Sequence, residues 1–254
     1  MRVIGICKIR NEERIMKETL DHWEKICTGG IYVYDDCSDD KTIEICENHP
    51  AVRKLIKGTY WDPERERAEH VNRQRVLDEA KHDAKEDDWF VYFDADERLY
   101  FDSWELLFEE GIDAIACKLY DIYITPEDVD KDYLEREWVG PESRTITFFF
   151  KNSPYIGYDK PDQRIVNLGP ASKVVLAGIV KHFGKGLSVE HWEETVDYYV
   201  DFWPKYAEKW KERRGKAIKK DYKSDFGNKL IKFKDVLSGR DEGISLEAQT
   251  YGNK

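Results

Sequence analysis

Short apolar runs alternate with amphipathic stretches over the first hundred residues. The apolar runs are Val3–Ile9, Ile31–Tyr34, Val52–Ile56 and Trp89–Phe93. Between them, apolar residues recur at helical spacing in about 11–27, 42–48 and 64–85. Strand and helix in regular alternation predict an α/β domain with a mainly parallel, Rossmann-like central sheet and helices on both faces.

The pattern changes after residue 100. A strand is expected at 114–124, and a loop at 125–143, where no clear periodicity appears. Three β-like runs follow at 145–150, 164–166 and 173–180. Ser188 then precedes a helical stretch as a plausible cap, and Pro204 is expected to kink or split that helix.

The last helical stretch has an almost entirely aromatic face. Its members alternate four and three positions apart: Trp192, Val196, Tyr199, Trp203, Tyr206 and Trp210. We expect this stripe to dock the helix onto the domain. The alternative is peripheral contact with an anionic membrane, because residues 205–234 carry twelve basic and four acidic side chains.

Charge and composition narrow the class of protein. The formal net charge is −11, which argues against a protein built to bind nucleic acid. No stretch approaches the roughly 20 apolar residues that cross a bilayer, and no secretory signal precedes the first run, so we expect a cytoplasmic protein. The five cysteines form no CxxC pair and favour reduced structural thiols over disulfides or a zinc site.

Acidic clusters follow two of the predicted strands. Asp35–Asp40 comes after the second, and Asp94-Ala95-Asp96 comes after the fourth. Parallel sheets bind ligands beyond the carboxyl ends of their strands, so both clusters are expected at one edge. Two carboxylates at i and i+2 suit a hard cation such as Mg²⁺ or Mn²⁺. The alternative is that Asp96 only caps a turn.

Four segments together resemble the nucleotide-binding half of family 2 glycosyltransferases, which have the GT-A fold. The segments are VIGICKIRNEE, IYVYDDCSDDKT, HVNRQRVLDEA and WFVYFDADERL, and they occur in the family's order and spacing. The likeness covers about one hundred residues and thins beyond Tyr100. Cys37 and Lys41 stand where the family usually has glycine.

The resemblance implies a role for several residues. Asp36 corresponds to the carboxylate that recognises the nucleotide base, in a pocket lined by Ile9 and Arg10. Asp94 would lie near the ribose or the donor sugar. Glu13 is implied to position the loop after the first strand, although an acidic residue at a helix N-terminus explains it equally well. Arg73 is a candidate for phosphate binding because it follows Asn72 in the family-like element.

The resemblance also implies a metal site. Asp96 would be the principal ligand of Mn²⁺ or Mg²⁺, which neutralises the diphosphate of a UDP- or GDP-linked sugar. His182, in VKHFG, is a candidate second ligand or a structural histidine. Asp159 and Asp162 are candidate general bases because they lie between the DxD motif and His182 in sequence, and exposed turn acids are the alternative for both.

These observations favour a metal-dependent, inverting hexosyltransferase that acts on a glycan, a lipid-linked or another hydroxyl acceptor. A sugar nucleotidyltransferase is the first alternative, but the first strand is followed by KIRNEE and not by a glycine-rich basic loop. A non-catalytic carbohydrate- or partner-binding module is the second. The expected organisation is a catalytic domain over 1–187, with nucleotide-binding (1–100) and acceptor (101–187) halves, and a basic helical extension over 188–254.

Overall fold

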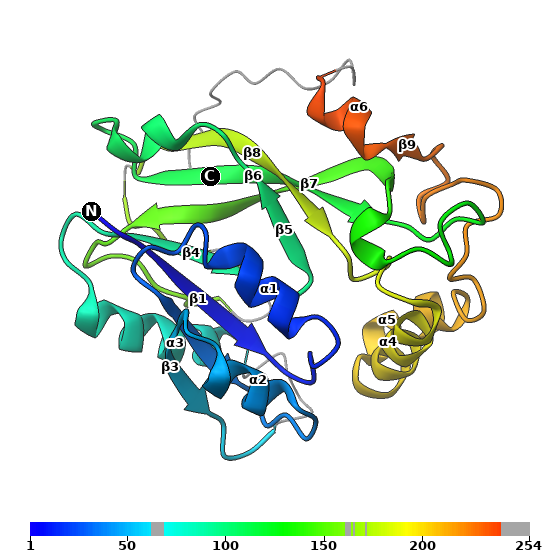
Figure 1. Cartoon of the computed structure of the whole chain (residues 1–254), viewed down its shortest axis with the longest axis horizontal. Helices are drawn as coiled ribbons and strands as arrows, with labels where there is room; N and C mark the ends of the chain where they lie inside the picture. Colours follow the sequence, from blue (N-terminus) through cyan, green and yellow to red (C-terminus); the bar gives the residue numbers. More distant parts are fainter. Residues whose placement is uncertain (62–68, 161–163, 165, 171, 240–254) are drawn as a thin grey trace.

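The computed structural model describes residues 1–61, 69–160, 164, 166–170 and 172–239. Within these residues, nine strands form one sheet in the order β3-β2-β1-β4-β7-β6-β8-β5, with β9 beside β7 (Figure 1). The strands are β1 (Val3–Ile9), β2 (Ile31–Asp35), β3 (Val52–Lys57), β4 (Trp89–Phe93), β5 (Glu97–Tyr100), β6 (Ala114–Ile122), β7 (Trp138–Lys151), β8 (Val174–His182) and β9 (Ile231–Lys232).

The helices follow the predicted alternation in the first half. They are α1 (Met16–Trp23), α2 (Thr42–Asn48), α3 (Glu69–Asp83), α4 (Val189–Phe202), α5 (Pro204–Lys211) and α6 (Phe233–Leu237), with 3₁₀ turns η2 (Trp104–Phe108) and η3 (Tyr133–Glu135). None of the helices described is long and apolar enough to cross a membrane.

The sheet is covered on both faces in its first half. Alternate residues of β1 enter different apolar clusters: Cys7 packs with Leu20 and Trp23 of α1, whereas Ile6 packs with Leu77 of α3. This division follows from the period of two in a strand. The α/β fold class predicted from the sequence is confirmed.

Parallel pairing holds over β3, β2, β1 and β4, but the second half of the sheet is mixed. β7 is antiparallel to β4 and β6, and β5 is antiparallel to β8, while β6 and β8 are parallel. The expected loop over 125–143 is wrong at its end, because Trp138–Ser143 begins β7 and pairs with β6. No strand is assigned to Arg164 or Val166, and residue 165 lies outside the described residues.

The C-terminal part begins with two helices and returns to the sheet. Ser188 caps α4 by accepting a hydrogen bond from the His191 amide at 3.0 Å, and Pro204 splits the helix as expected. Trp192 and Val196 of α4 pack with Trp210 and Ala217. The extension expected to be helical also supplies β9, which pairs with β7. Figure 1 shows α4 and α5 beside the edge of the sheet toward which β1 points.

Candidate active site

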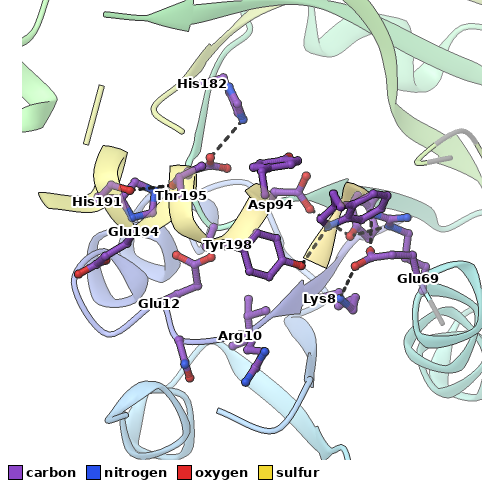
Figure 2. Close-up of a pocket in the computed structure, with 18 residues that line it drawn as sticks. Lys8, Arg10, Glu12, Glu69, Asp94, His182, His191, Glu194, Thr195 and Tyr198 are labelled. Atoms are coloured by element: carbon purple, nitrogen blue, oxygen red, sulfur yellow. Dashed lines mark hydrogen bonds and ion pairs between the residues drawn. The ribbon is translucent and has the colours of Figure 1, made fainter. Parts of the chain in front are cut away.

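A cavity of about 590 Å³ opens at the carboxyl ends of β1 and β4 (Figure 2). One side, here called the strand-end wall, consists of residues 8–12, Glu69, Arg73, Tyr92, residues 94–96 and His182. The other side, here called the helix wall, consists of His191, Glu194, Thr195, Tyr198, Tyr199 and Trp203. The predicted edge of the sheet is therefore where a pocket forms, and α4 closes it.

Strand pairing brings Asp96 and His182 together. β5 begins one residue after Asp96 and pairs with β8 so that Glu97 lies opposite His182. The Phe183 amide donates to the Asp96 carbonyl at 2.8 Å, which extends the register. As a result, Asp96 Oδ2 lies 3.1 Å from His182 Nε2. The two residues predicted as metal ligands are adjacent.

Each of these groups stabilises the charged form of the other. Burial would raise the pKa of Asp96, but the charge and hydrogen bond of His182 outweigh it and lower that pKa to about 2. Burial would lower the pKa of His182, but Asp96 and Asp121 raise it to about 10. In the metal-free protein the pair is therefore a carboxylate and an imidazolium at neutral pH.

A second carboxylate fixes the orientation of His182. Asp121, on β6, accepts from His182 Nδ1 at 2.6 Å and pairs with Lys185 at 2.8 Å. Lys185 also pairs with Asp225 at 3.1 Å. Burial opposes ionisation of Asp121, but the hydrogen bond and charge of His182 hold its pKa well below the usual range. A ligating histidine held in this way presents its other ring nitrogen in a fixed direction.

Asp225 joins the C-terminal segment to this network. Its side chain is only 3% exposed and contacts three cations: Lys185, Arg213 at 2.8 Å and Lys219 at 2.6 Å. Removing one partner of a buried ion pair is strongly destabilising, because the other charge stays desolvated. The segment after α5 is thus tied to the elements that hold His182.

Gly184 leaves space between the two candidate ligands. A Cβ at this position would lie 2.8 Å from Asp96 Oδ2 and 2.9 Å from His182 Cε1. No positive φ explains the glycine. One carboxylate oxygen and one imidazole nitrogen facing this space fit a divalent cation that completes its shell with phosphate oxygens and water.

Asp94 and Glu97 share Arg164. Arg164 Nη1 lies 3.0 Å from Asp94 Oδ2, and Arg164 Nη2 donates to Glu97 Oε2 at 2.7 Å. Glu97 also accepts from the Asp94 amide at 2.9 Å. Glu97 is therefore a buried support for the turn, whereas Asp94 lines the pocket. Arg164 is engaged with both carboxylates.

Asp36, implied to recognise the base, belongs to a buried chain of charged and polar side chains. Lys8 Nζ lies 3.1 Å from Asp36 Oδ2 and 2.9 Å from Glu69 Oε1, and Asn72 approaches Asp36 at 3.4 Å. Asp36 is nearly fully buried and does not line the pocket, whereas Lys8 and Glu69 do. Sequence reasoning missed both, although the position of Lys8 inside an apolar strand was a signal.

The loop after β1 is held against the loop after β2. Glu13 Oε2 accepts from the Lys41 amide at 3.0 Å, and the Glu13 amide donates to Asp40 at 3.1 Å. Cys37, where the family usually has glycine, has a φ of 60°. This left-handed backbone is the conformation that glycine adopts most easily. The contacts of Glu13 agree with a positioning role for this residue.

The other predicted residues divide between pocket and surface. Ile9, Arg10 and Arg73 line the pocket, and Arg73 pairs with Glu69 at 2.9 Å and donates to the Tyr92 hydroxyl at 3.0 Å. Asp159 is exposed, accepts from Asn167 at 3.0 Å and is not a lining residue. Asp162 lies outside the described residues.

The sequence did not predict a helix wall; it assigned Tyr199 and Trp203 to a stripe that docks the helix, whereas both line the pocket. The members of this wall on α4 recur at i, i+3, i+4, i+7 and i+8 from His191, so they share one helical face. Burial lowers the pKa of His191 below its usual value, although Asp96 opposes this shift. Arg14 holds the helix through two contacts with Glu194 at 2.8 and 2.7 Å.

A separate group of candidate ligands lies on α1 and after α2. Asp21, Glu24 and His49 bring ligand atoms within 4.8 Å of one another, and His49 Nε2 lies 3.1 Å from Asp21 Oδ1. None of the three lines the pocket. We assign them no role in the site.

The chain is similar to known proteins over a short stretch of sequence. The uncharacterized protein Rv3786c of Mycobacterium tuberculosis is 39% identical over 57 residues, which are 22% of this chain and 14% of that protein. The chain thus matches only a small part of its curated relatives.

Two solved structures are similar at low identity. S. aureus TarS 1–349 is 16% identical, with 80% of this chain and 66% of that chain covered and a TM-score of 0.44. Glucosyl-3-phosphoglycerate synthase from Mycobacterium tuberculosis, in complex with Mn²⁺, UDP and glucosyl-3-phosphoglycerate, is 17% identical, with 46% and 44% covered and a TM-score of 0.33. These values do not bear on the substrate of this chain.

The family comparison is more extensive. The glycosyl transferase family 2 model matches residues 6–163, which is more than half of the chain and includes Asp36, Asp94 and Asp96. The match extends beyond the hundred residues on which the sequence resemblance rested. The chain therefore belongs to glycosyl transferase family 2.

Proposed function

We propose that this protein transfers a hexosyl unit from a UDP- or GDP-linked sugar to an acceptor hydroxyl, with inversion and with Mn²⁺ or Mg²⁺. Glycosyl transfer follows from family membership. The observation that best supports the finer proposal is the 3.1 Å approach of Asp96 Oδ2 to His182 Nε2 beside the space left by Gly184. This arrangement favours a transferase over a binding module in which Asp96 only caps a turn.

Different residues are proposed to bind the cation, to orient its ligands and to supply positive charge. Asp96 and His182 would hold the cation, which neutralises the diphosphate leaving group when bound. Asp121 keeps Nδ1 of His182 occupied, so that Nε2 faces the site. Lys8, Arg10 and Arg73 add positive charge on the strand-end wall, which also carries the carboxylates of Glu12, Glu69, Asp94 and Asp96. A wall with this many carboxylates can bind the diphosphate only if these cationic side chains and a metal ion offset its negative charge.

We propose His191 as the general base that takes the proton from the acceptor hydroxyl. Its imidazole belongs to the pocket, and its lowered pKa keeps it neutral and able to take a proton at pH 7. Asp159 and Asp162 stay predictions for this role. A residue that acts as the base is expected to cause a large loss of kcat when replaced, with little change in nucleotide affinity.

Peripheral membrane contact also stays a prediction. Several basic side chains of residues 205–234 are already engaged within the protein: Lys211, Arg213, Arg214, Lys219 and Lys232. Sedimentation with anionic and with neutral liposomes at low and high salt tests it. Electrostatic binding requires the anionic lipid and weakens with salt.

A screen of nucleotide sugars for Mn²⁺-stimulated hydrolysis tests the proposed activity without knowledge of the acceptor. We expect hydrolysis of at least one UDP- or GDP-linked hexose. Asp96→Asn is expected to reduce it on the order of a thousandfold, since a catalytic cation is worth several kcal/mol. Full activity of that variant would remove Asp96 from the metal site.

A further inference from the structure

The helix α4 runs along the pocket from the candidate metal ligands to the loop after β1. At its beginning, His191 is close enough to Asp96 for the carboxylate to affect its ionisation. At its end, the Phe202 ring meets the Trp61 ring edge-on at 5.0 Å. The Arg10 guanidinium lies 3.7 Å from the Trp61 ring centroid, so this end of α4 adjoins the loop after β1.

Aromatic side chains are concentrated at that second end. Tyr198, Tyr199 and Trp203 line the pocket, and Figure 2 shows Tyr198 between Asp94 and Arg10. Trp203 Nε1 donates to the Tyr198 hydroxyl at 3.4 Å, which links the two side chains. Tyr199 is stacked on Trp210 at 4.4 Å with an interplanar angle of 5°. The aromatic group is therefore packed from behind by the rest of the stripe.

The two walls offer different chemistry to a ligand at this end. The strand-end wall presents Lys8, Arg10, Glu69 and Arg73, which can pair with the polar edge of a base and with phosphates. The helix wall presents aromatic side chains. A nucleobase has both features, since its edge forms hydrogen bonds and its face stacks on aromatic rings.

We propose that Tyr198 and Trp203 stack on the nucleobase of the donor. The helix α4 and the residue that follows it would then form one side of the donor site. This inference rests on the proposed function, because it requires a nucleotide donor. Stacking tolerates any base, so the choice between bases belongs to the polar groups of the strand-end wall. The aromatic stripe thereby serves both packing, through Trp192 and Trp210, and ligand binding.

Comparing the affinity for nucleoside diphosphates with that for pyrophosphate distinguishes contacts to the base from contacts to the phosphates. Binding of UDP, GDP and pyrophosphate in the presence of Mn²⁺ is measured by calorimetry on the full chain. We expect Tyr198→Ala and Trp203→Ala each to weaken binding of the nucleoside diphosphate that the wild type prefers by about 5- to 100-fold, the loss of one stacking contact. Pyrophosphate binding is expected to stay within about twofold. Tyr198→Phe, which keeps the ring, retains most of the affinity.

The control is Phe108→Ala, which removes an aromatic side chain that is 72% exposed and outside the pocket. Equal weakening of pyrophosphate and nucleotide would overturn the proposal, because the effect would then act through the metal site or the fold. Unchanged nucleotide affinity in both alanine variants would overturn it as well. If the wild-type chain binds pyrophosphate but no nucleoside diphosphate, the proposed function fails together with it.

Discussion

The two walls of the pocket are built by different means. The strand-end wall is charged, and its side chains follow directly from strands whose register fixes them, as in the pairing of Glu97 with His182. The helix wall is largely aromatic and belongs to α4, whose position is not fixed by strand pairing. The first wall depends on local sequence and strand pairing, and the second depends on how α4 is docked.

A few contacts hold α4 against the loops that follow β1 and β3. They include the Arg14–Glu194 ion pair and the Trp61–Phe202 ring contact, while Asp225 anchors the segment that follows α5. The ion pair is solvent-exposed, so it contributes little to stability and mainly sets orientation. The two walls can therefore be perturbed separately.

The largest effect on the strand-end wall alone is expected from Gly184→Ala. The added methyl group would occupy the space between Asp96 and His182, so Mn²⁺ affinity is expected to fall by about a hundredfold or more, the loss of several kcal/mol of metal binding. Calorimetric titration of Mn²⁺ measures this change. The methyl group also crowds the Asp96–His182 ion pair, so the melting temperature without metal is expected to fall, and the titration is carried out at a temperature at which the variant is folded.

The matched control for that variant is Gly157→Ala. Its added Cβ would meet the end of the flexible Gln74 side chain at 3.1 Å, and no positive φ is required there. Metal affinity of the control is expected to equal that of the wild type. Tight Mn²⁺ binding by Gly184→Ala would show that the cation does not occupy this space.

A smaller effect is expected from Asp121→Asn. The variant removes the charge that orients His182 but leaves the donor set complete, so Mn²⁺ affinity is expected to fall about 10- to 100-fold. The control Arg144→Gln removes a half-exposed partner of the same carboxylate and is expected to change affinity only slightly. Equal affinities for wild type and Asp121→Asn would return Asp121 to a purely structural role.

The smallest of these effects concerns pH. The pKa of His182 is raised to about 10 in the folded protein, so protonation stabilises the metal-free fold. That contribution is fully present below about pH 6.5, the unfolded value, and is lost as pH rises toward 10. The melting temperature of the metal-free protein is expected to fall from pH 6.5 to 9.5, and His182→Gln is expected to flatten this slope. Identical slopes would contradict the ion pair with Asp96.

The sequence predicted the strand-end wall well for a physical reason. A buried strand that ends in carboxylates places them at the edge of a parallel sheet, so Asp94 and Asp96 could be located without tertiary information. The pairing of Lys8 with Asp36 was missed because Asp36 directly follows β2, and only the pairing of β1 with β2 brings the two residues together. The start of the strand from Trp138 was missed because Gly140 and Pro141 interrupt it and its buried residues do not alternate there.

The helix wall could not be predicted in the same way. The aromatic spacing from Trp192 to Trp210 predicted a helix that docks, and Trp192 and Val196 do pack as expected. The face that carries His191 and Tyr198 has no distinctive local pattern. Its position in the pocket results from contacts with distant residues such as Arg14 and Trp61, which only the folded chain brings near.

The central claim is that Asp96 and a divalent cation hold a nucleoside diphosphate in this pocket. Thermal unfolding of wild type and Asp96→Asn with UDP or GDP, with and without Mn²⁺, tests it most directly. At a ligand concentration of about 100 Kd, binding stabilises by about 2.7 kcal/mol, which predicts a rise of roughly 5–10 °C in Tm. We expect this rise only in the wild type and only with Mn²⁺. No rise with either nucleotide, or the same rise in Asp96→Asn, would contradict the claim.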